Sequence, residues 1–216
     1  MTDLPILYSF RRCPYAIRAR LAIAVSGQQV ALREVVLRDK APEFLETSPT
    51  ATVPCLKVEN TILDESLDIM VWALRHSDPE GWLSPEEGSA EEMFALIDEC
   101  DGPFKQHLDR YKYDTRYKDT DRELERASAS AFLRKLDIML QKRPWLFGRR
   151  ASLADYAILP FVRQFANANR DWFDGEEWTA LKAWLVMFET SDRFLNVMPK
   201  WQKWHAGSEP IVFPDT

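Results

Sequence analysis

Hydrophobic and polar positions in the first third of the chain follow strand and helix patterns in turn. Short apolar runs typical of strands lie at 6–10, 30–37, 55–58 and 61–63. Between the first two runs, a helix with one buried face is predicted by the spacing of Ile17, Leu21, Ala24 and Val25. Gly27 then supplies a helix stop, and the last two runs predict a hairpin that turns at Glu59-Asn60. The first two strands and their helix form a β-α-β unit, so we expect these strands to be parallel.

Two further helices complete this region. A short helix or turn is expected over 42–46, and apolar residues from Leu67 to Leu74 mark a longer helix with Ser66 near its start. The resulting order, β-α-β-α-β-β-α, is that of a thioredoxin-like domain, which we place at residues 1–78. Residues 79–89 are rich in Pro, Gly, Asp, Glu and Ser and predict a linker, with Trp82 packed against a domain face.

Residues 90–216 predict a second, all-helical domain. One helix begins at Ala90, and Gly102-Pro103 is expected to kink or break it. The next helix covers roughly 121–141, and the residues expected on its inward face are Leu124, Ala127, Ala131, Leu136 and Leu140. Ser152-x-x-Asp155 has the pattern of a capping box at the start of another helix. Two more helical stretches are predicted at 177–188 and 192–204.

Composition narrows the classes of function. The chain has 216 residues, 46% of them hydrophobic, which is enough for a substantial core. Its net charge of −6 gives no general attraction to nucleic acid or anionic lipid. No apolar run approaches the ~20 residues of a membrane span, and the start of the chain has no signal-peptide pattern. The three cysteines are widely spaced, which favours a reducing cytoplasm, and the three histidines are isolated, so we expect no metal site.

Cys13 is the strongest candidate for chemistry. It lies directly after a strand and before a helix, where unpaired backbone N–H groups favour a thiolate over a thiol. Pro14 suits the first helical position, and Arg11 and Arg12 place two cations just before the sulfur. Such surroundings lower a cysteine pKa. The alternative is a small buried residue at a strand–helix junction.

Four local patterns together resemble the glutathione transferase superfamily over nearly the whole chain. The segment Cys13-Pro14-Tyr15-Ala16, followed by Arg18 and Arg20, is similar to the active-site segment of cysteine-type members, the omega and glutaredoxin-like classes. The other patterns are Val53-Pro54, where the superfamily has a cis-proline, the acidic-serine pair Glu65-Ser66, and Ser152-x-x-Asp155. The resemblance implies a thioredoxin-like domain joined to an all-helical domain.

The resemblance also implies a set of site residues, with Cys13 as the catalytic group and glutathione as cosubstrate without a metal. The backbone of Val53, before a cis bond to Pro54, would pair with the bound peptide. Ser66 at a helix start can donate to the γ-glutamyl carboxylate, and Glu65 can accept from its ammonium group. By resemblance, Arg38 holds the glycyl end and Tyr15 contacts the sulfur region.

Ala16 stands where a dithiol glutaredoxin has its second cysteine, so the implied mechanism uses one thiol. It predicts a glutathione-dependent thiol transferase or reductase that acts on disulfides, dehydroascorbate or glutathionyl adducts. Two alternatives stay open. One is a conventional glutathione-conjugating transferase, and the other is a non-enzymatic interaction protein with the same fold.

Several residues have simpler interpretations. Pro54 could be an ordinary loop proline, and Glu65-Ser66 could be only a helix cap. Tyr8 and Ser9 occupy strand positions that disfavour a catalytic role, and Cys55 and Cys100 lie in apolar patterns typical of a core. The residues expected to line an acceptor pocket are Phe104, Lys105, Leu108, Tyr111, Lys112 and, more weakly, Trp172. Members of the superfamily are commonly homodimers, but the sequence has no decisive interface pattern.

Overall fold

The computed structural model describes residues 4–215, and the chain divides into two compact units. The first unit comprises the chain up to Glu80 together with the segment from Asp192 onward, and the second is Gly81–Ser191. The C-terminal segment, which we expected to belong to the helical domain, therefore packs with the thioredoxin-like unit. Within residues 4–215, no helix is both long enough and apolar enough to cross a membrane.

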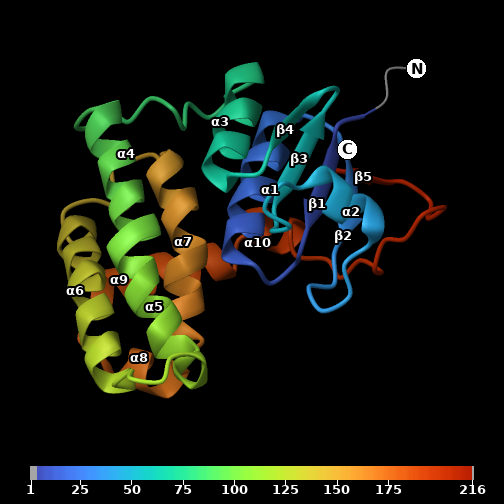
Figure 1. Ribbon diagram of the computed structural model, residues 1–216. Coiled ribbons are helices and arrows are strands. Elements are labelled where there is room, and N and C mark those ends of the chain that lie inside the picture. Colours follow the sequence, from blue (N-terminus) through green and yellow to red (C-terminus); the bar gives the residue numbers. More distant parts are fainter. Residues whose placement is uncertain (1–3, 216) are drawn as a thin grey trace. The chain divides into compact units, whose positions relative to one another are not determined.

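The first unit is built on a five-stranded sheet with the order β4-β3-β1-β2-β5 (Figure 1). Its strands are β1 (Ile6–Ser9), β2 (Val30–Glu34), β3 (Cys55–Val58), β4 (Thr61–Leu63) and β5 (Ile211–Phe213). The strands β1 and β2 are parallel, whereas β3 is antiparallel to both β1 and β4. The predicted β-α-β unit and the hairpin at Glu59-Asn60 are both confirmed.

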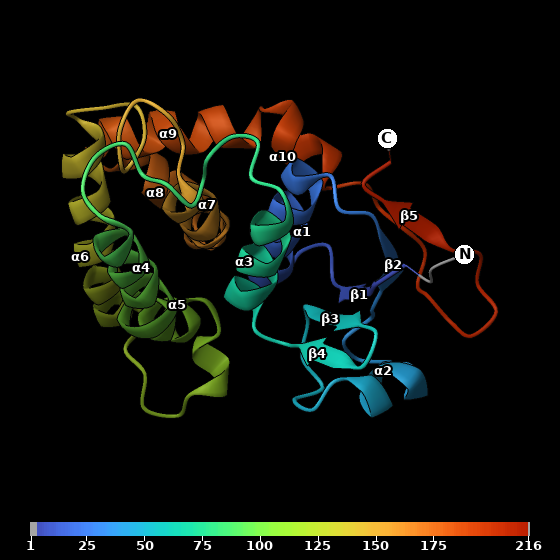
Figure 2. The ribbon, with the colours of Figure 1, turned by 90° about the horizontal axis from the view of Figure 1, so that it is seen from above.

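Helices cover both faces of this sheet. The crossover helix α1 (Pro14–Ser26) packs against α3 (Ser66–His76), and α2 (Pro42–Thr47) lies toward the other face (Figure 2). Gly27 ends α1 with a φ of 71°, and its N–H donates to the carbonyl of Ala24. The helix is buried on almost every side, so the single inward stripe predicted from the sequence is too narrow.

The C-terminal segment adds a strand that the sequence did not predict. The strand β5 pairs antiparallel with β2, placing Ile211 opposite Leu32. The helix α10 (Asp192–Asn196) is also much shorter than the predicted 192–204. Pro199 has no backbone N–H with which to continue a helix, and the chain beyond it runs back to the edge of the sheet.

The second unit is helical. Its α-helices are α4 (Ala90–Glu99), α5 (Lys105–Lys112), α6 (Arg122–Leu140), α7 (Leu153–Ala166), α8 (Arg170–Gly175) and α9 (Thr179–Glu189). A π-helical turn, Cys100–Phe104, joins α4 to α5, so the irregularity predicted at Gly102-Pro103 is confirmed. Trp82 is fully buried and stacks on Tyr156 with ring centroids 4.1 Å apart, as expected for a tryptophan anchoring the linker.

The predicted inward face of α6 is wrong in its first half. Leu124 is 64% exposed, and Ala127 and Ala131 are exposed as well. The helix instead turns Glu125 inward, and its carboxylate is paired with His107 and Arg110 of α5. The inward residues Ala129, Leu133, Leu136 and Leu140 then follow at helical spacing.

Candidate active site

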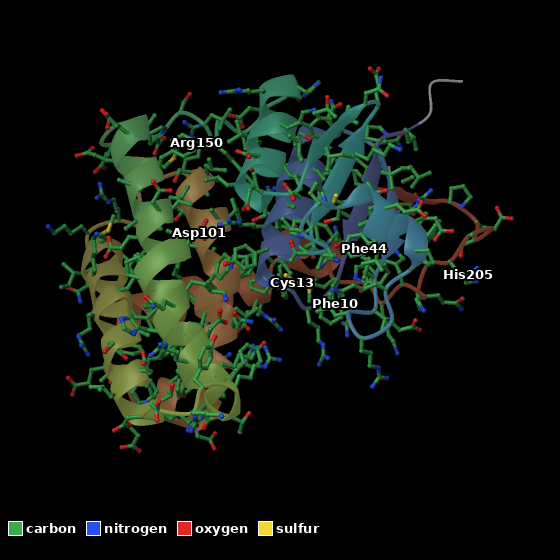
Figure 3. The ribbon with its side chains drawn as sticks, viewed as in Figure 1. Phe10, Cys13, Phe44, Asp101, Arg150 and His205 are labelled. Atoms are coloured by element: carbon green, nitrogen blue, oxygen red, sulfur yellow. The ribbon has the colours of Figure 1, made fainter. Side chains whose placement is uncertain are left out.

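Cys13 is the N-cap residue of α1, and its side chain is half-buried. Its N–H donates to the carbonyl of Phe10 at 3.0 Å, and its carbonyl accepts the first helical hydrogen bond, from Ile17, at 2.9 Å. Pro14 occupies the first turn, where no backbone donor is needed. The thiol donates from Sγ to the carbonyl oxygen of Val53 at 3.6 Å. The sulfur therefore lies at the positive end of α1 and against the segment that leads into β3 (Figure 3).

The segment against the thiol has the backbone conformation that the resemblance implied. The bond between Val53 and Pro54 is cis. The side chain of Val53 is buried in an apolar cluster with Tyr8, Phe44 and other residues, while its carbonyl faces Cys13. Residues 40 positions apart in the chain are thus brought together at one end of the sheet.

Arg20 is a fully buried cation behind the loop that carries Cys13. It donates from Nη2 to the carbonyl of Arg11 at 2.8 Å and from Nη1 to Oγ of Ser9 at 3.2 Å. Its Nη1 also lies 3.9 Å from Oε2 of Glu34, whose Oε1 accepts the backbone N–H of Arg11 at 2.8 Å. These contacts fix the backbone that leads from β1 into Cys13.

Burial and neighbouring charges set the ionisation of this group. Burial lowers the pKa of Arg20 to about 10, although Glu34 and Cys13 act in the opposite direction, so the guanidinium stays charged at neutral pH. Burial likewise raises the pKa of Glu34 above its usual range, opposed by the Arg11 N–H and by Arg20. Coulombic interactions act on both partners, so the Arg20 cation also favours the thiolate form of Cys13.

A second buried arginine supports the start of α3. Arg18 is 1% exposed and donates from Nε to Oγ of Ser66, the first residue of α3, at 2.9 Å. Because Oγ accepts this bond, the hydroxyl proton of Ser66 is directed to another acceptor. Glu65 is the exposed N-cap residue of the same helix, and its side chain makes no cap hydrogen bond. A hydroxyl, free backbone N–H groups and a carboxylate therefore meet at one helix start.

The other two residues assigned to glutathione lie in different environments. Tyr15 is half-buried in the first turn of α1, and its ring centroid is 5.2 Å from the guanidinium carbon of Arg18. Arg38 is exposed in the loop that follows β2. Because neither side chain is fully buried, neither is committed to packing the core.

The residues that we disfavoured as catalytic groups are all buried. The hydroxyl of Tyr8 accepts a hydrogen bond from Arg33 at 2.7 Å, and Ser9 is bound to Arg20. Cys55 and Cys100 are fully buried, and burial raises the pKa of Cys55 to about 11. At neutral pH the Cys55 thiol is therefore protonated and a poor nucleophile.

The residues expected to line an acceptor pocket lie in the core of the helical unit. Phe104, Leu108 and Tyr111 are each at most 1% exposed. The ring centroids of Phe104 and Tyr111 lie 6.1 and 5.1 Å from that of Phe165 in α7. Trp172 is half-buried, with the Arg126 guanidinium carbon 4.3 Å from its ring centroid. Lys105 is paired with Asp109 on its own helix, and Lys112 lies 5.1 Å from the ring centroid of Tyr113.

Sequence patterns included Arg18 and Arg20 in the segment around Cys13. They missed the buried contacts of these arginines with Ser66 and Glu34. The missed signal lies in α1 itself, which is apolar apart from Tyr15, Arg18, Arg20 and its terminal serine. A helix that is apolar on every side is buried, so any arginine in it must be paired inside the protein. Among residues 4–215, no three histidine, cysteine or acidic side chains converge as a metal-binding group.

Comparison with known proteins agrees with this geometry. A model of the glutathione S-transferase N-terminal domain matches residues 7–81, and a model of the C-terminal domain matches residues 91–185. A glutathione S-transferase of Arabidopsis thaliana, U22, is 33% identical over 89 residues. That match covers 37% of this chain and 41% of the relative, so it spans less than half the length of either protein.

Solved structures show the same fold at low identity. A glutathione transferase family member from Pseudomonas fluorescens, with two glutathione molecules bound, has a TM-score of 0.79 and 20% identity over 92% of this chain and 93% of that chain. Glutathione transferase Omega 3C from Trametes versicolor has a TM-score of 0.76 and 20% identity over 95% of this chain and 88% of that chain. A Pseudomonas putida glutathione transferase with glutathione disulfide bound has a TM-score of 0.77 and 20% identity over 91% of each chain. The fold and the two family models together show that this chain belongs to the glutathione S-transferase family.

Proposed function

We propose that this protein is a glutathione-dependent thiol transferase in which Cys13 alone is the nucleophile. The observation that carries the proposal is the position of the Cys13 sulfur, at the N-terminus of α1 and 3.6 Å from the Val53 carbonyl oxygen. Ionisation gives up the hydrogen bond to the Val53 carbonyl, and the resulting thiolate is stabilised by the N-terminus of α1 and by the Arg20 cation. Cys55 and Cys100 are buried and take no part.

Glutathione is proposed to lie along the edge formed by Val53 and the start of α3. The backbone of Val53 would pair with the peptide groups next to the glutathione sulfur. Ser66 would donate its hydroxyl proton to the γ-glutamyl carboxylate, and Glu65 would accept from the ammonium group. Tyr15 would contact the sulfur region, and Arg38 would pair with the glycyl carboxylate.

The reaction proceeds by two thiol–disulfide exchanges. The Cys13 thiolate attacks the glutathionyl sulfur of a mixed disulfide, the original S–S bond breaks, and the acceptor leaves as a thiolate that takes up a proton from water. A second glutathione thiolate then attacks the glutathione sulfur bound to Cys13. This step releases glutathione disulfide and regenerates the Cys13 thiolate. Each turnover therefore consumes one free glutathione, because the other half of the glutathione disulfide comes from the mixed-disulfide substrate.

The nature of two structural relatives is consistent with this chemistry. The Pseudomonas putida relative binds glutathione disulfide, and another relative belongs to the Omega class. Ala16 leaves no second thiol within a helical turn of Cys13, so release by an external glutathione is the simplest route.

The proposal is tested with the mixed disulfide of glutathione and 2-mercaptoethanol as substrate. We expect Cys13→Ala to lose at least ~100-fold of the turnover, because the nucleophile is gone. The matched control, Cys100→Ala, removes a buried thiol from the helical unit and should retain full turnover. Full activity in Cys13→Ala would overturn the proposal. Turnover of a chloronitrobenzene acceptor that exceeds disulfide exchange, and that survives Cys13→Ala, would instead identify a conventional conjugating transferase.

A further inference from the structure

A cavity of about 600 Å³ opens in the first unit beside the loop that carries Cys13. It is lined by residues 10–12, which immediately precede Cys13, by the end of β2, and by residues 200–203 of the C-terminal segment. Its volume lies within the range of small-molecule binding sites. Because residues 200–203 form one wall, the cavity exists only while the C-terminal segment is folded against the sheet.

The charges around this cavity are predominantly positive, although the whole chain carries a net charge of −6. The cations on its wall are Arg11, Arg12, Lys200 and Lys203. Within residues 4–215, Arg12 and Lys200 form no ion pair with a carboxylate, whereas Lys203 is paired with Asp39. Cations gathered at a cavity without matching carboxylates attract an anion.

The acidic residue that lines the cavity does not cancel this charge. Glu34 is 7% exposed, and its Oε1 accepts the backbone N–H of Arg11. Its Oε2 lies 3.9 Å from the fully buried guanidinium of Arg20. The Glu34 carboxylate is therefore balanced from within the protein, and the charges of Arg12 and Lys200 on the cavity wall are not cancelled by it.

The remaining wall is apolar, and it reaches Cys13 through the preceding residues 10–12, although Cys13 itself does not line the cavity. Phe10, Val35 and Trp201 line the cavity. Phe10 and Cys13 both pack against the apolar cluster that contains Val35, and Figure 3 shows these two residues together at the start of α1. A ligand with an apolar body can occupy this wall while its charged group contacts the cations.

We propose that this cavity binds the acceptor substrate, and that the acceptor is a disulfide-bearing organic anion with an apolar body. The inference rests on the proposed thiol-transferase function and names its substrate class. When the acceptor is joined to glutathione in a mixed disulfide, the Cys13 thiolate bonds to the glutathionyl sulfur, and the acceptor sulfur leaves with the electron pair of the broken S–S bond. With a symmetrical disulfide of the acceptor, Cys13 bonds to one sulfur and the other leaves in the same way. The anionic group of the acceptor is held by Lys200 and Arg12 during this step.

The experiment compares two aromatic disulfides in a single-turnover reaction without glutathione. Dithiobis(nitrobenzoate) carries carboxylates, whereas dithiodipyridine is neutral at pH 7.5. We expect Lys200→Gln to slow the reaction of Cys13 with the anionic disulfide by roughly 5-fold at low ionic strength, the effect of removing one nearby charge in water. The neutral disulfide should react at the wild-type rate. The effect should disappear at about 0.5 M salt, where such charges are screened.

The matched control is Lys57→Gln, which removes an exposed lysine of β3 that does not line the cavity. It should leave both rates unchanged. Free nitrobenzoate should protect Cys13 from the anionic disulfide in the wild-type protein and protect it less in Lys200→Gln. Equal effects of Lys200→Gln on both disulfides, or an effect no larger than that of Lys57→Gln, would overturn the acceptor assignment. A Cys13 that reacts with neither disulfide would overturn it as well.

This experiment separates the acceptor assignment from the proposed function. Glutathione is absent from the single-turnover reaction, so a protein that never completes a glutathione cycle would still show the preference for the anionic disulfide. Conversely, full thiol-transferase turnover without a preference for the anionic disulfide would support the proposed function and overturn the acceptor assignment.

Discussion

The Nε–H of Arg18 donates to Oγ of Ser66 at 2.9 Å, and this bond joins α1 to the first residue of α3. Both side chains are almost fully buried. The bond fixes the orientation of the Ser66 hydroxyl at the place proposed for the γ-glutamyl carboxylate. Arg18 would thereby control how the γ-glutamyl end of glutathione is held, without touching the glutathione thiol.

The first prediction concerns that bond. Replacing Arg18 by methionine keeps much of the buried volume and removes the donor to Ser66. We expect the KM for glutathione to rise by about 10-fold, the effect of losing roughly one hydrogen bond to a charged group, with a smaller change in kcat. Adding Ser66→Ala to Arg18→Met should change the KM little further, because both changes act on the same hydroxyl. Fully additive effects would show that Arg18 acts elsewhere.

The second prediction concerns the charge of Arg20. Arg20→Met removes the cation that favours the Cys13 thiolate, so alkylation of Cys13 by iodoacetamide should slow several-fold at pH 7. At about pH 10 the thiol ionises without that cation, and the alkylation rate should approach that of the wild-type protein. Arg20→Lys keeps the charge and should be closer to wild type at pH 7. An equal loss of rate at both pH values would indicate a displaced loop in place of a lost charge.

The third prediction distinguishes the three cysteines. In the native protein at pH 8, iodoacetamide should label Cys13 and leave Cys55 and Cys100 unmodified. Cys55 is buried, and its pKa of about 11 keeps it protonated at this pH. Peptide mapping by mass spectrometry gives the extent of labelling at each site, and unfolding in urea should expose all three. Rapid native-state labelling of Cys55 would contradict the burial described above.

The fourth prediction concerns stability and pH. Asp155 is fully buried, and its carboxylate accepts hydrogen bonds from the N–H groups of Leu146 and Ser152 and from Ser152 Oγ. Burial outweighs these bonds and raises the pKa of Asp155 from 3.8 to about 6. Between these values the native state binds more protons than the unfolded state, so this contribution to stability falls as the pH rises.

The contribution of Asp155 to the free energy of unfolding should fall by about 3 kcal/mol in total as the pH rises, and it should stop changing above roughly pH 7. Urea unfolding of the wild-type protein and of Asp155→Asn at several pH values from 4 to 7 isolates this contribution. The difference in the free energy of unfolding, wild type minus variant, should decrease across that window. A difference that is flat or that increases with pH would contradict the raised pKa.

Local patterns were sufficient for much of the fold and for the placement of Cys13 at the start of α1. The hairpin at Glu59-Asn60, the stop at Gly27 and the irregular turn at Gly102-Pro103 all depend on residues that are close in sequence. Cys13 could be assigned to a helix start because the strand before it and the proline after it are adjacent.

Features that depend on distant partners could not be predicted in this way. The three-residue strand β5 is recognisable only from its pairing with β2, about 180 residues earlier. Leu124 has the spacing of a core residue but is exposed, because α6 packs through the face that carries Ala129 and Leu133. The cavity beside Cys13 likewise needs Lys200 and Trp201 to meet Arg12, which no local spacing indicates.

The proposed chemistry depends on a mixed disulfide between Cys13 and glutathione. The most direct measurement is the intact mass of the native protein after incubation with glutathione disulfide, followed by peptide mapping. We predict one glutathionyl group per chain, located on Cys13, absent from Cys13→Ser and removed by added reduced glutathione. An adduct on Cys55 or Cys100, or no adduct in a protein that still turns over glutathione, would contradict it.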